Sequence, residues 1–248
     1  MKLLFKVNPF KRELRIFYSD VRSFLEENNV SIVEEPEEAD ILLTIGGDGT
    51  ILYNRVKYSK YDLPIFGIGT ETSFICQAKT IDWKEKLEKL INKKYSIESR
   101  TLLDIFVNNE FIADSLNEAL IRNIDPKILR FDVLVKHSAS NSNRFIFSAD
   151  GFIVATPTGS SAHAYACYAD IIDESTNSLV LVAVAPHRRE FTPMYILNTS
   201  TIEINLSDAE NRHQRIQLVS DGLCGFNLSS TDIILIKRSK KKQKFIKI

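Results

Sequence analysis

The chain has 248 residues, 44% hydrophobic and 26% charged, which is an ordinary composition for a globular protein with a sizeable core. Its 32 basic and 32 acidic residues balance, so no bulk charge favours nucleic acid or a membrane surface as partner. No apolar run is long enough to span a bilayer, and we expect no signal peptide because Met1-Lys2-Leu3 opens a strand pattern.

The cysteines indicate a reducing compartment. Cys76, Cys167 and Cys224 are far apart, odd in number and next to apolar residues. This usage favours reduced, buried thiols over a disulfide framework or a zinc site, and the four histidines show no metal-ligand spacing with them. We therefore expect a cytoplasmic protein.

The first 95 residues alternate between short apolar strands and helical periodicity. The expected strands are 3–7, 31–33, 40–45 and 64–68, and the expected helices are 13–27 and 83–91. Such alternation predicts an α/β domain over residues 1–95, in which helices flank a parallel sheet. Ligands of such sheets bind beyond the C-terminal ends of the strands.

One of these strand ends carries a glycine cluster around a carboxylate. The apolar run 41–45 leads into Gly46-Gly47-Asp48-Gly49-Thr50. Glycines let backbone amides approach a ligand closely, and a helix starting near Thr50 favours an anion, so a phosphate-bearing ligand is expected beside Asp48. The alternative is a strand-to-turn junction that only needs glycine. The loop 67–73 follows the next strand, and we expect it to line the same cleft.

The pattern changes near Ser96 to short alternating strands. They are expected at 97–107, 111–113, 116–122, 131–137, 145–148, 152–155, 179–185, 202–206 and 216–219. Their spacing predicts an all-β, sandwich-like domain over 96–228, interrupted by a helix over 160–169. Residues 229–248 hold a last strand, 232–237, expected to return to the first domain. A basic tail follows, expected to be solvated or frayed, with phosphate binding as the alternative.

Three segments of this second part concentrate polar residues. Asn117 and Glu118 lie inside an apolar run, and their side chains suit ribose hydroxyls or a carboxamide, unless they mark an edge strand with one polar face. Thr158, Ser160 and Ser161 stand at the expected helix start, where they predict either an anion site or simple capping. His163, one turn further, is either a structural residue or a ligand contact. Ser220-Asp221-Gly222 alone indicates only a hairpin turn.

In combination these motifs resemble the NAD kinase family over nearly the whole chain. The resemblance rests on 46–50, Asn117-Glu118, Asp150-Gly151 and 155–160, with Pro186-His187 and Asp221-Gly222 at similar places. Diacylglycerol and sphingosine kinases share the glycine element, but their Asn-Glu follows it directly, where this chain has Leu52-Tyr53-Asn54-Arg55. A lipid or other nucleoside kinase on the same scaffold and a non-catalytic dinucleotide sensor remain the alternatives.

The resemblance implies an α/β N-terminal domain and a β-sandwich C-terminal domain with the active site between them. It implies phosphorylation of the 2′-hydroxyl of the adenosine ribose of NAD to give NADP. ATP or polyphosphate would be the donor. Magnesium or another divalent metal would be bound through the donor, not by protein side chains. A homodimer or homotetramer is implied as well.

The resemblance also implies roles for single residues. Asp48 would act as base or orienter for the 2′-hydroxyl, Asn117 and Glu118 would bind the nicotinamide-side ribose, and Asp221 would close the site near the transferred phosphate. Phe74 would flank the adenine. The residues implied to serve the phosphates are Gly46, Gly47, Gly49 and Thr50. The residues implied to line the nicotinamide and adenine pockets are Asp150, Thr158, Ser161 and Ala162, with His163 as a further NAD contact.

The chain departs from the family pattern around the NAD pocket. The family has a Gly-x-Asn-x-Gly-x-x-Gly-Phe-Leu loop after the fourth strand, whereas residues 67–75 lack that Asn and two of the glycines and are one residue short. His163 replaces an expected Tyr, and Tyr168-Ala169-Asp170 replaces Gly-Gly-Pro. These changes leave open the shape of the pocket and its preference between NAD and NADH.

Overall fold

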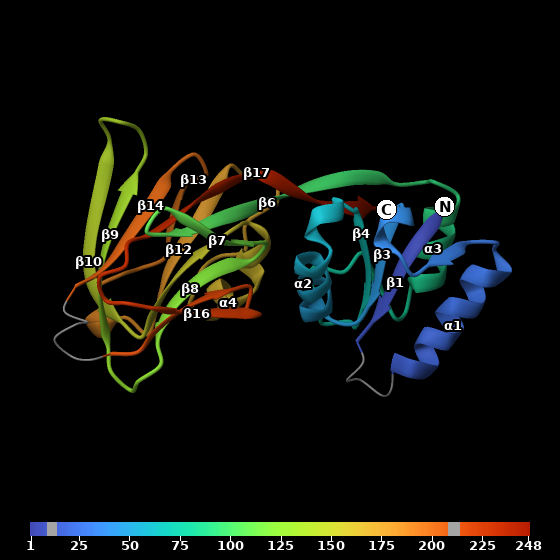
Figure 1. The fold of residues 1–248 in the computed structure, drawn as a ribbon, viewed down its shortest axis with the longest axis horizontal. Coiled ribbons are helices and arrows are strands. Elements are labelled where there is room, and N and C mark those ends of the chain that lie inside the picture. Colours follow the sequence, from blue (N-terminus) through green and yellow to red (C-terminus); the bar gives the residue numbers. More distant parts are fainter. Residues whose placement is uncertain (9–13, 208–213) are drawn as a thin grey trace. The chain divides into compact units, whose positions relative to one another are not determined.

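The computed structural model describes residues 1–8, 14–207 and 214–248 (Figure 1). They form two compact units, residues 1–100 with 243–248 and residues 101–242. The sequence places a boundary between residues 95 and 96, whereas the structure places it inside β6 (Ser96–Val107), because this strand starts in the first unit and ends in the second.

The first unit is built on a parallel sheet. Its strands are β1 (Lys2–Val7), β2 (Ser31–Val33), β3 (Ile41–Ile45), β4 (Ile65–Gly69) and β5 (Ala78–Lys79). They run in the order β2-β1-β3-β4-β5, and every pair is parallel. The helices are α1 (Leu14–Glu27), α2 (Asp48–Lys57) and α3 (Trp83–Ile91), with short 3₁₀ turns η1 (Pro36–Glu38) and η2 (Ser59–Tyr61). The expected α/β domain is confirmed.

Side-chain alternation along the strands assigns a helix layer to each face of this sheet. Phe5, Leu43 and Phe66 share one apolar cluster with buried residues of α1 and α3. On the other face Ile51 of α2 packs on β4 so closely that a Cβ at Gly67 would lie 2.5 Å from its Cδ1. Figure 1 shows α1 and α2 on opposite sides of β1, β3 and β4. Among the described helices, none is long and apolar enough to cross a membrane.

The second unit is a β-sandwich. One layer holds β7 (Glu110–Ser115), β9 (Leu129–Lys136), β10 (Ser142–Ala149), β14 (Thr201–Ser207) and parts of β6 and of β17 (Ile234–Lys247). The other layer runs β13-β12-β11-β8-β15-β16, and its pairs are antiparallel. Its strands are β8 (Glu118–Asn123), β11 (Gly151–Ala155), β12 (Ser178–Val184), β13 (Met194–Leu197), β15 (Ile216–Ser220) and β16 (Cys224–Leu228). The expected sandwich is confirmed.

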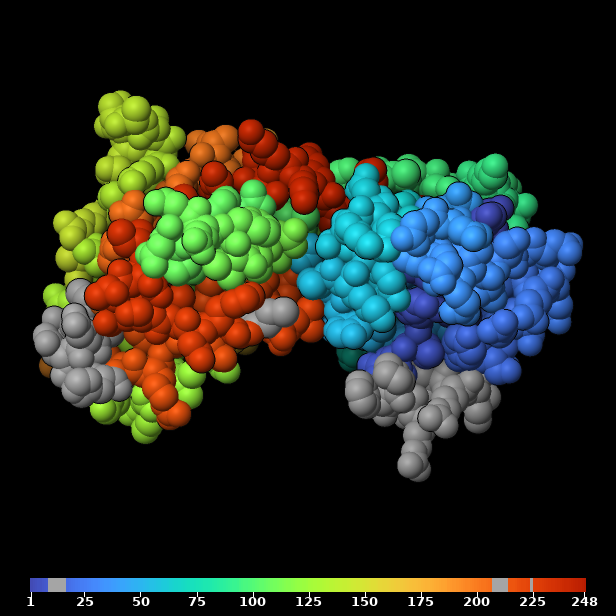
Figure 2. Space-filling view, in the orientation of Figure 1, coloured from blue at the N-terminus to red at the C-terminus, as the bar shows by residue number. Residues whose placement is uncertain are grey.

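The two layers meet across a core that contains several phenylalanine rings. Phe152 of β11 is fully buried, and its ring lies 5.9 Å from Phe131 and 5.4 Å from Phe147, both of the opposite layer. Figure 2 shows the β6–β7 hairpin, in green, on the surface of this unit, in keeping with the 56% exposure of Phe111 on β7. The apolar alternation of the strands therefore points inward, as the sequence predicts.

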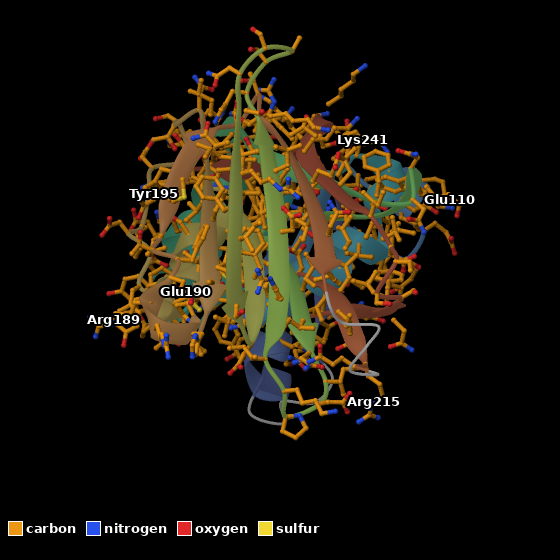
Figure 3. The ribbon with its side chains drawn as sticks, turned by 90° about the vertical axis from the view of Figure 1, so that its left-hand side faces the viewer. Glu110, Arg189, Glu190, Tyr195, Arg215 and Lys241 are labelled. Carbon is orange, nitrogen blue, oxygen red and sulfur yellow. The ribbon has the colours of Figure 1, made fainter. Side chains whose placement is uncertain are left out.

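The outer face of the β8–β11–β12 layer is also buried. Ile153 and Val182 pack there against Ala164 of α4 (His163–Ala166). The segment after α4 is fixed by Tyr195, whose hydroxyl accepts a hydrogen bond from Asp170 N (2.6 Å). Tyr195 lies on the same side of the unit as Arg189, the last residue of η4 (His187–Arg189), and Glu190, which follows it (Figure 3). These central strands are thus covered on both faces.

The helix expected over 160–169 is wrong. The chain instead forms a 3₁₀ turn, η3 (Thr158–Ser161), and then the single-turn helix α4. Ala162 between them has φ −98° and ψ −125°, which is not helical, and Tyr168 at φ 68° ends the segment. The Ala-rich composition favours a helix, but packing of this segment on the sheet overrides the local propensity.

The expected frayed tail is also wrong, although its lysines are solvated. The strand predicted to end at Lys237 continues to Lys247 as β17, and Phe245 on it pairs with Ile65 of β4. Phe245 and Ile246 are buried, whereas Lys240 and its basic neighbours are exposed. The two apolar residues near the end of the strand anchor a segment whose lysine content suggests disorder.

Replacing Tyr168 by glycine is expected to stabilise the protein. Tyr168 holds a left-handed conformation at the end of α4 with a side chain that is 91% exposed, so the substitution removes strain and loses little packing. We expect a gain of about 0.5–1 kcal/mol, because relief of the left-handed strain exceeds the entropic cost of glycine. Chemical denaturation measures it. The control is Tyr165→Gly inside α4, which should destabilise; equal effects of both variants would contradict the argument.

Candidate active site

The glycine turn after β3 and the loop after β4 begin side by side. Ile45 pairs in register with Ile68 of the neighbouring parallel strand, and Gly46 N donates to Ile68 O (3.0 Å). Gly46 has φ 150°, and a Cβ there would lie 2.2 Å from Thr50 Oγ1. Only glycine therefore fits this position, and the chain turns directly into α2.

Asp48, the first residue of α2, ties these two loops together. Its Oδ2 accepts a hydrogen bond from Phe74 N (2.9 Å), and its Oδ1 accepts one from Ile75 N (3.0 Å). A carboxylate oxygen can accept two hydrogen bonds, so Oδ2 keeps capacity for a ligand hydroxyl. Phe74 is thus held beside Asp48 by its backbone, while its side chain is 65% exposed. The two loops are therefore neighbours, and the expectation that they line one cleft stays a prediction.

Cys76 lies beneath this carboxylate. Its Sγ contacts Gly46 O at 3.5 Å and Asp48 Oδ1 at 3.9 Å. Burial, together with the charge of Asp48, raises the pKa of the Cys76 thiol to about 12. The thiol therefore remains a neutral, weak hydrogen-bond donor. Lys79 also supports the loop, because its ammonium donates to the carbonyl of Ser73.

A cleft of about 530 Å³ opens beside the first turn of α2. Its lining residues are Lys6, Val7, Asn8, Gly49, Thr50, Tyr53, Asn54 and Lys57. The ammonium groups of Lys6 and Lys57 both lie over the ring of Tyr58, at 5.8 and 5.3 Å from its centroid. The cleft thus combines two cations with the start of a helix, an arrangement that suits an anion.

In the second unit, Asp221 organises the turn before β8. Its Oδ2 accepts from Leu116 N (2.8 Å), and its Oδ1 accepts from Asn117 N (2.7 Å) and Glu118 N (3.2 Å). Asp221 is 5% exposed and stands at φ 51° in the β15–β16 turn. The hairpin that Ser220-Asp221-Gly222 predicts is therefore present, and its carboxylate points onto three consecutive backbone amides.

Asn117 and Glu118 are buried, and one oxygen of each side chain lacks a partner. Asn117 is 5% and Glu118 8% exposed, yet Asn117 Oδ1 and Glu118 Oε2 have no hydrogen-bond partner within the described part of the chain. The same holds for Thr158 Oγ1 on the adjoining segment. Burial and, secondly, the charge of Asp221 raise the pKa of Glu118 to about 8. Buried polar atoms without partners are costly, so this arrangement suits a polar ligand.

The segment after β11 packs directly on Asn117. Thr156 N donates to Asn117 O (2.9 Å), and a Cβ at Gly159 would lie 2.0 Å from that carbonyl oxygen. The anion site predicted at this turn stays a prediction. Ser160 Oγ donates to Pro157 O (2.6 Å) and Ser161 Oγ to Thr158 O (3.0 Å), so both hydroxyls serve the turn itself.

Comparison with known proteins supplies the family. Residues 116–248 match the family model described as ATP-NAD kinase C-terminal domain. An NAD kinase from Methanosarcina acetivorans is 30% identical over 244 residues, which cover 94% of this chain and 85% of that protein. The chain belongs to the NAD kinase family. The resemblance that the motifs indicate is thereby confirmed.

Further relatives agree with this assignment. An NAD kinase from Methanosarcina barkeri is 33% identical over 86% of this chain and 74% of that protein. A crystal structure of an NAD kinase from Archaeoglobus fulgidus in complex with ATP has a TM-score of 0.77 at 22% identity, over 99% of this chain and 93% of that chain. Yeast NADH kinase complexed with NADH has a TM-score of 0.79 at 18% identity, over 100% and 83%. These two structures show the shared fold.

Not every residue that the NAD kinase resemblance implies is brought to Asn117 and Glu118. Asp150 is exposed and precedes β11, whereas Ala155 at the other end of that strand pairs with Glu118. Ala162 is half-buried and His163 exposed. The roles of these three residues in binding NAD stay predictions, as do those of Phe74 and Asp221.

The structure also adds residues that sequence reasoning missed. Cys167 is half-buried, and its pKa is raised by burial and by the charge of Glu118. Cys167 therefore lies near Glu118. Lys6, Lys57 and Cys76 flank the glycine turn. No local pattern marks them, because each reaches its place through contacts between segments distant in sequence.

Gly159→Ala is expected to destabilise this NAD kinase-family protein by about 3 kcal/mol, because the new Cβ would overlap the Asn117 carbonyl and the backbone has to shift. Thermal unfolding measures the effect. The matched control is Gly49→Ala, where a Cβ meets nothing within 4 Å. That variant should gain roughly 0.5–1 kcal/mol, since alanine favours a helix. Unchanged stability of Gly159→Ala would show that the close approach is not required.

The raised pKa of Glu118 predicts a pH dependence of stability. The native protein keeps this carboxyl protonated up to about pH 8, whereas the unfolded chain loses the proton near 4.5. The stabilising contribution is therefore full below about pH 4.5 and is lost as the pH rises through 8. Relative to Glu118→Gln, which does not titrate, the wild type should lose on the order of a few kcal/mol over this window. The same pH dependence of the free energy of unfolding in both proteins would contradict this prediction.

Proposed function

We propose that this protein transfers a phosphoryl group to the 2′-hydroxyl of the adenosine ribose of NAD, giving NADP. The observation that carries the proposal is the buried, unpartnered set of oxygens on Asn117, Glu118 and Thr158. A nucleotide ribose offers hydroxyl donors that satisfy such acceptors. Family membership supplies the reaction class, and these oxygens supply a reason for an acceptor that contains a ribose.

In this proposal Asn117 and Glu118 bind the nicotinamide-side ribose. The Asn117 amide can accept through Oδ1 and donate through its nitrogen, so it matches a hydroxyl that does both. Glu118 in its protonated form also offers both a donor and an acceptor. The pair can therefore hold two neighbouring hydroxyls of one ring.

Asp48 is proposed to act on the acceptor hydroxyl. In the transfer, the ribose O2′–P bond forms, the bond from the terminal phosphorus to the donor's bridging oxygen breaks, and the 2′-hydroxyl loses its proton. Asp48 accepts or orients that proton through Oδ2, where Phe74 N leaves acceptor capacity unused. Phosphoryl transfer depends mainly on such positioning and on charge stabilisation.

The donor is proposed to be ATP or polyphosphate, held at the glycine turn and in the cleft beside Thr50. Lys6 and Lys57 supply positive charge there, and the first turn of α2 supplies amides. The Archaeoglobus fulgidus relative, crystallised in complex with ATP, supports ATP as donor.

A divalent metal such as magnesium belongs to the proposal as part of the donor. Within residues 1–8, 14–207 and 214–248, no group of three or more His, Cys, Asp or Glu side chains is placed to hold an ion. We propose that the metal is bound through the donor phosphates. When bound, it neutralises phosphate charge, which reconciles the donor with the nearby carboxylate of Asp48.

Two further parts of the proposal concern assembly and location. We propose a homodimer or homotetramer, which light scattering would test directly; a monomer at working concentration would remove this part. We propose a cytoplasmic location, supported by the free thiols Cys76 and Cys167.

The decisive experiment incubates the pure protein with NAD, magnesium and either ATP or polyphosphate, and separates NADP from NAD. Formation of NADP with one donor identifies that donor. If neither donor yields NADP although the protein measurably binds NAD, the proposal is overturned in favour of a dinucleotide sensor.

Asp48→Ala is expected to lower kcat by about 10²–10⁴-fold, the usual range for loss of a general base, while the Kd for NAD stays nearly unchanged. Single-turnover kinetics and calorimetry measure the two quantities. Asp82→Ala is a matched control, because Asp82 Oδ1 also accepts a backbone amide, Lys79 N (2.6 Å), just before a helix of the same unit. Turnover retained in Asp48→Ala would move the proton acceptor to another residue.

A further inference from the structure

We propose that Asp221 is a positioning residue of the acceptor site: it acts through the backbone of Leu116–Glu118 and fixes how Asn117 and Glu118 are presented. This inference rests on the proposed function, since it assumes that the pair binds the nicotinamide-side ribose of the acceptor NAD. It differs from a contact with the transferred phosphate, the role that the resemblance implies for Asp221. Asp221 instead shapes the site without touching the reacting atoms.

The contacts of Asp221 make it the centre of the turn. The amides of Leu116, Asn117 and Glu118 converge on its carboxylate, and Asp221 N returns a hydrogen bond to Glu118 O (3.0 Å). Three consecutive amides that face one point form a concave site for an anion. In this protein the anion is a side chain of the chain itself, and it is 5% exposed.

The surrounding bonds leave the turn little freedom while Asp221 is present. Asn117 is held from both sides, because its N–H donates to Asp221 and its C=O accepts from Thr156 N. Beside it, Ser115 Oγ and Ser220 Oγ are hydrogen-bonded at 2.7 Å, and Ser220 Oγ bonds to Asp114 O at 3.0 Å. These contacts connect the end of β7 to the end of β15. Asp221 extends the connection to the two residues whose side chains need a ligand.

Asp221 also sets the electrostatics of Glu118. The titratable groups that reach Glu118 are Asp221, from the turn after β15, and the thiol of Cys167, from the segment after α4. Burial raises the pKa of Glu118 most, and the negative charge of Asp221 adds to the increase. Removal of that charge therefore lowers the pKa of Glu118, and a purely structural role of Asp221 predicts no such change.

The test compares Asp221→Asn with the wild type in steady-state kinetics across the pH range around 8. Asparagine keeps the left-handed conformation and one acceptor oxygen but loses the charge. We expect KM for NAD to rise about tenfold and kcat to change little, as for a lost charge-assisted hydrogen bond. The inflection in KM should move to lower pH. An unmoved inflection or an unchanged KM would overturn the inference.

Two other variants keep the result interpretable. Asp232→Asn is the matched control, since Asp232 Oδ2 accepts Ser229 N (2.7 Å) in another turn of the same unit; it should leave KM and its inflection unchanged. Ser220→Ala weakens the same connection but retains the charge of Asp221. It should raise KM about threefold, as for one neutral hydrogen bond, without moving the inflection. If Asp221→Asn does not fold, a Ser220→Ala variant with wild-type KM overturns the inference.

Failure of the inference can be separated from failure of the proposed function. Glu118→Ala should raise KM for NAD if the pair binds the acceptor. No change in that variant would remove the proposed role of the pair. A raised KM in Glu118→Ala with no change in Asp221→Asn would leave the proposed function intact and remove only the role of Asp221.

Discussion

The parallel pairing of β3 with β4 is the constraint on which the first unit's chemistry depends. It places the ends of the two strands at one edge, so the glycine turn and the loop after β4 share the carboxylate of Asp48. Because Gly67 has no side chain, α2 can pack closely on the sheet. Because Gly46 has none, there is room for Thr50 in the first turn of α2. An exposed loop residue, Phe74, is thereby fixed by its backbone rather than by its side chain.

The second unit uses the same device for a different purpose. In both units an aspartate joins two loops by accepting backbone amides. Asp48 is half-buried and accepts two amides, so its Oδ2 retains capacity for a ligand. Asp221 is buried and accepts three, so its carboxylate serves the protein. The number of amides and the degree of burial thus distinguish the two carboxylates.

Sequence patterns anticipate the elements whose signal is local. The apolar runs and glycines predict β3, β4 and the turn at 46–50, and helical spacing predicts α3 at its observed bounds. Sequence patterns fail where contacts between distant segments determine the local structure. Composition predicts a helix over 160–169, but Gly159 has to lie against the Asn117 carbonyl and Ala162 departs from helical geometry. No local sequence pattern predicts that Cys76 contacts Asp48, or that Lys6 and Lys57 both lie over the ring of Tyr58.

The strand β17 has a consequence for the order in which the molecule is built. Its first half pairs with β14 of the second unit, and its last residues, Phe245 and Ile246, enter the first unit beside β4. During synthesis, residues 1–100 are made long before these two side chains exist to complete their core. The first unit therefore folds to completion only after the second has been made, and until then the edge of β4 stays open to pairing with other chains.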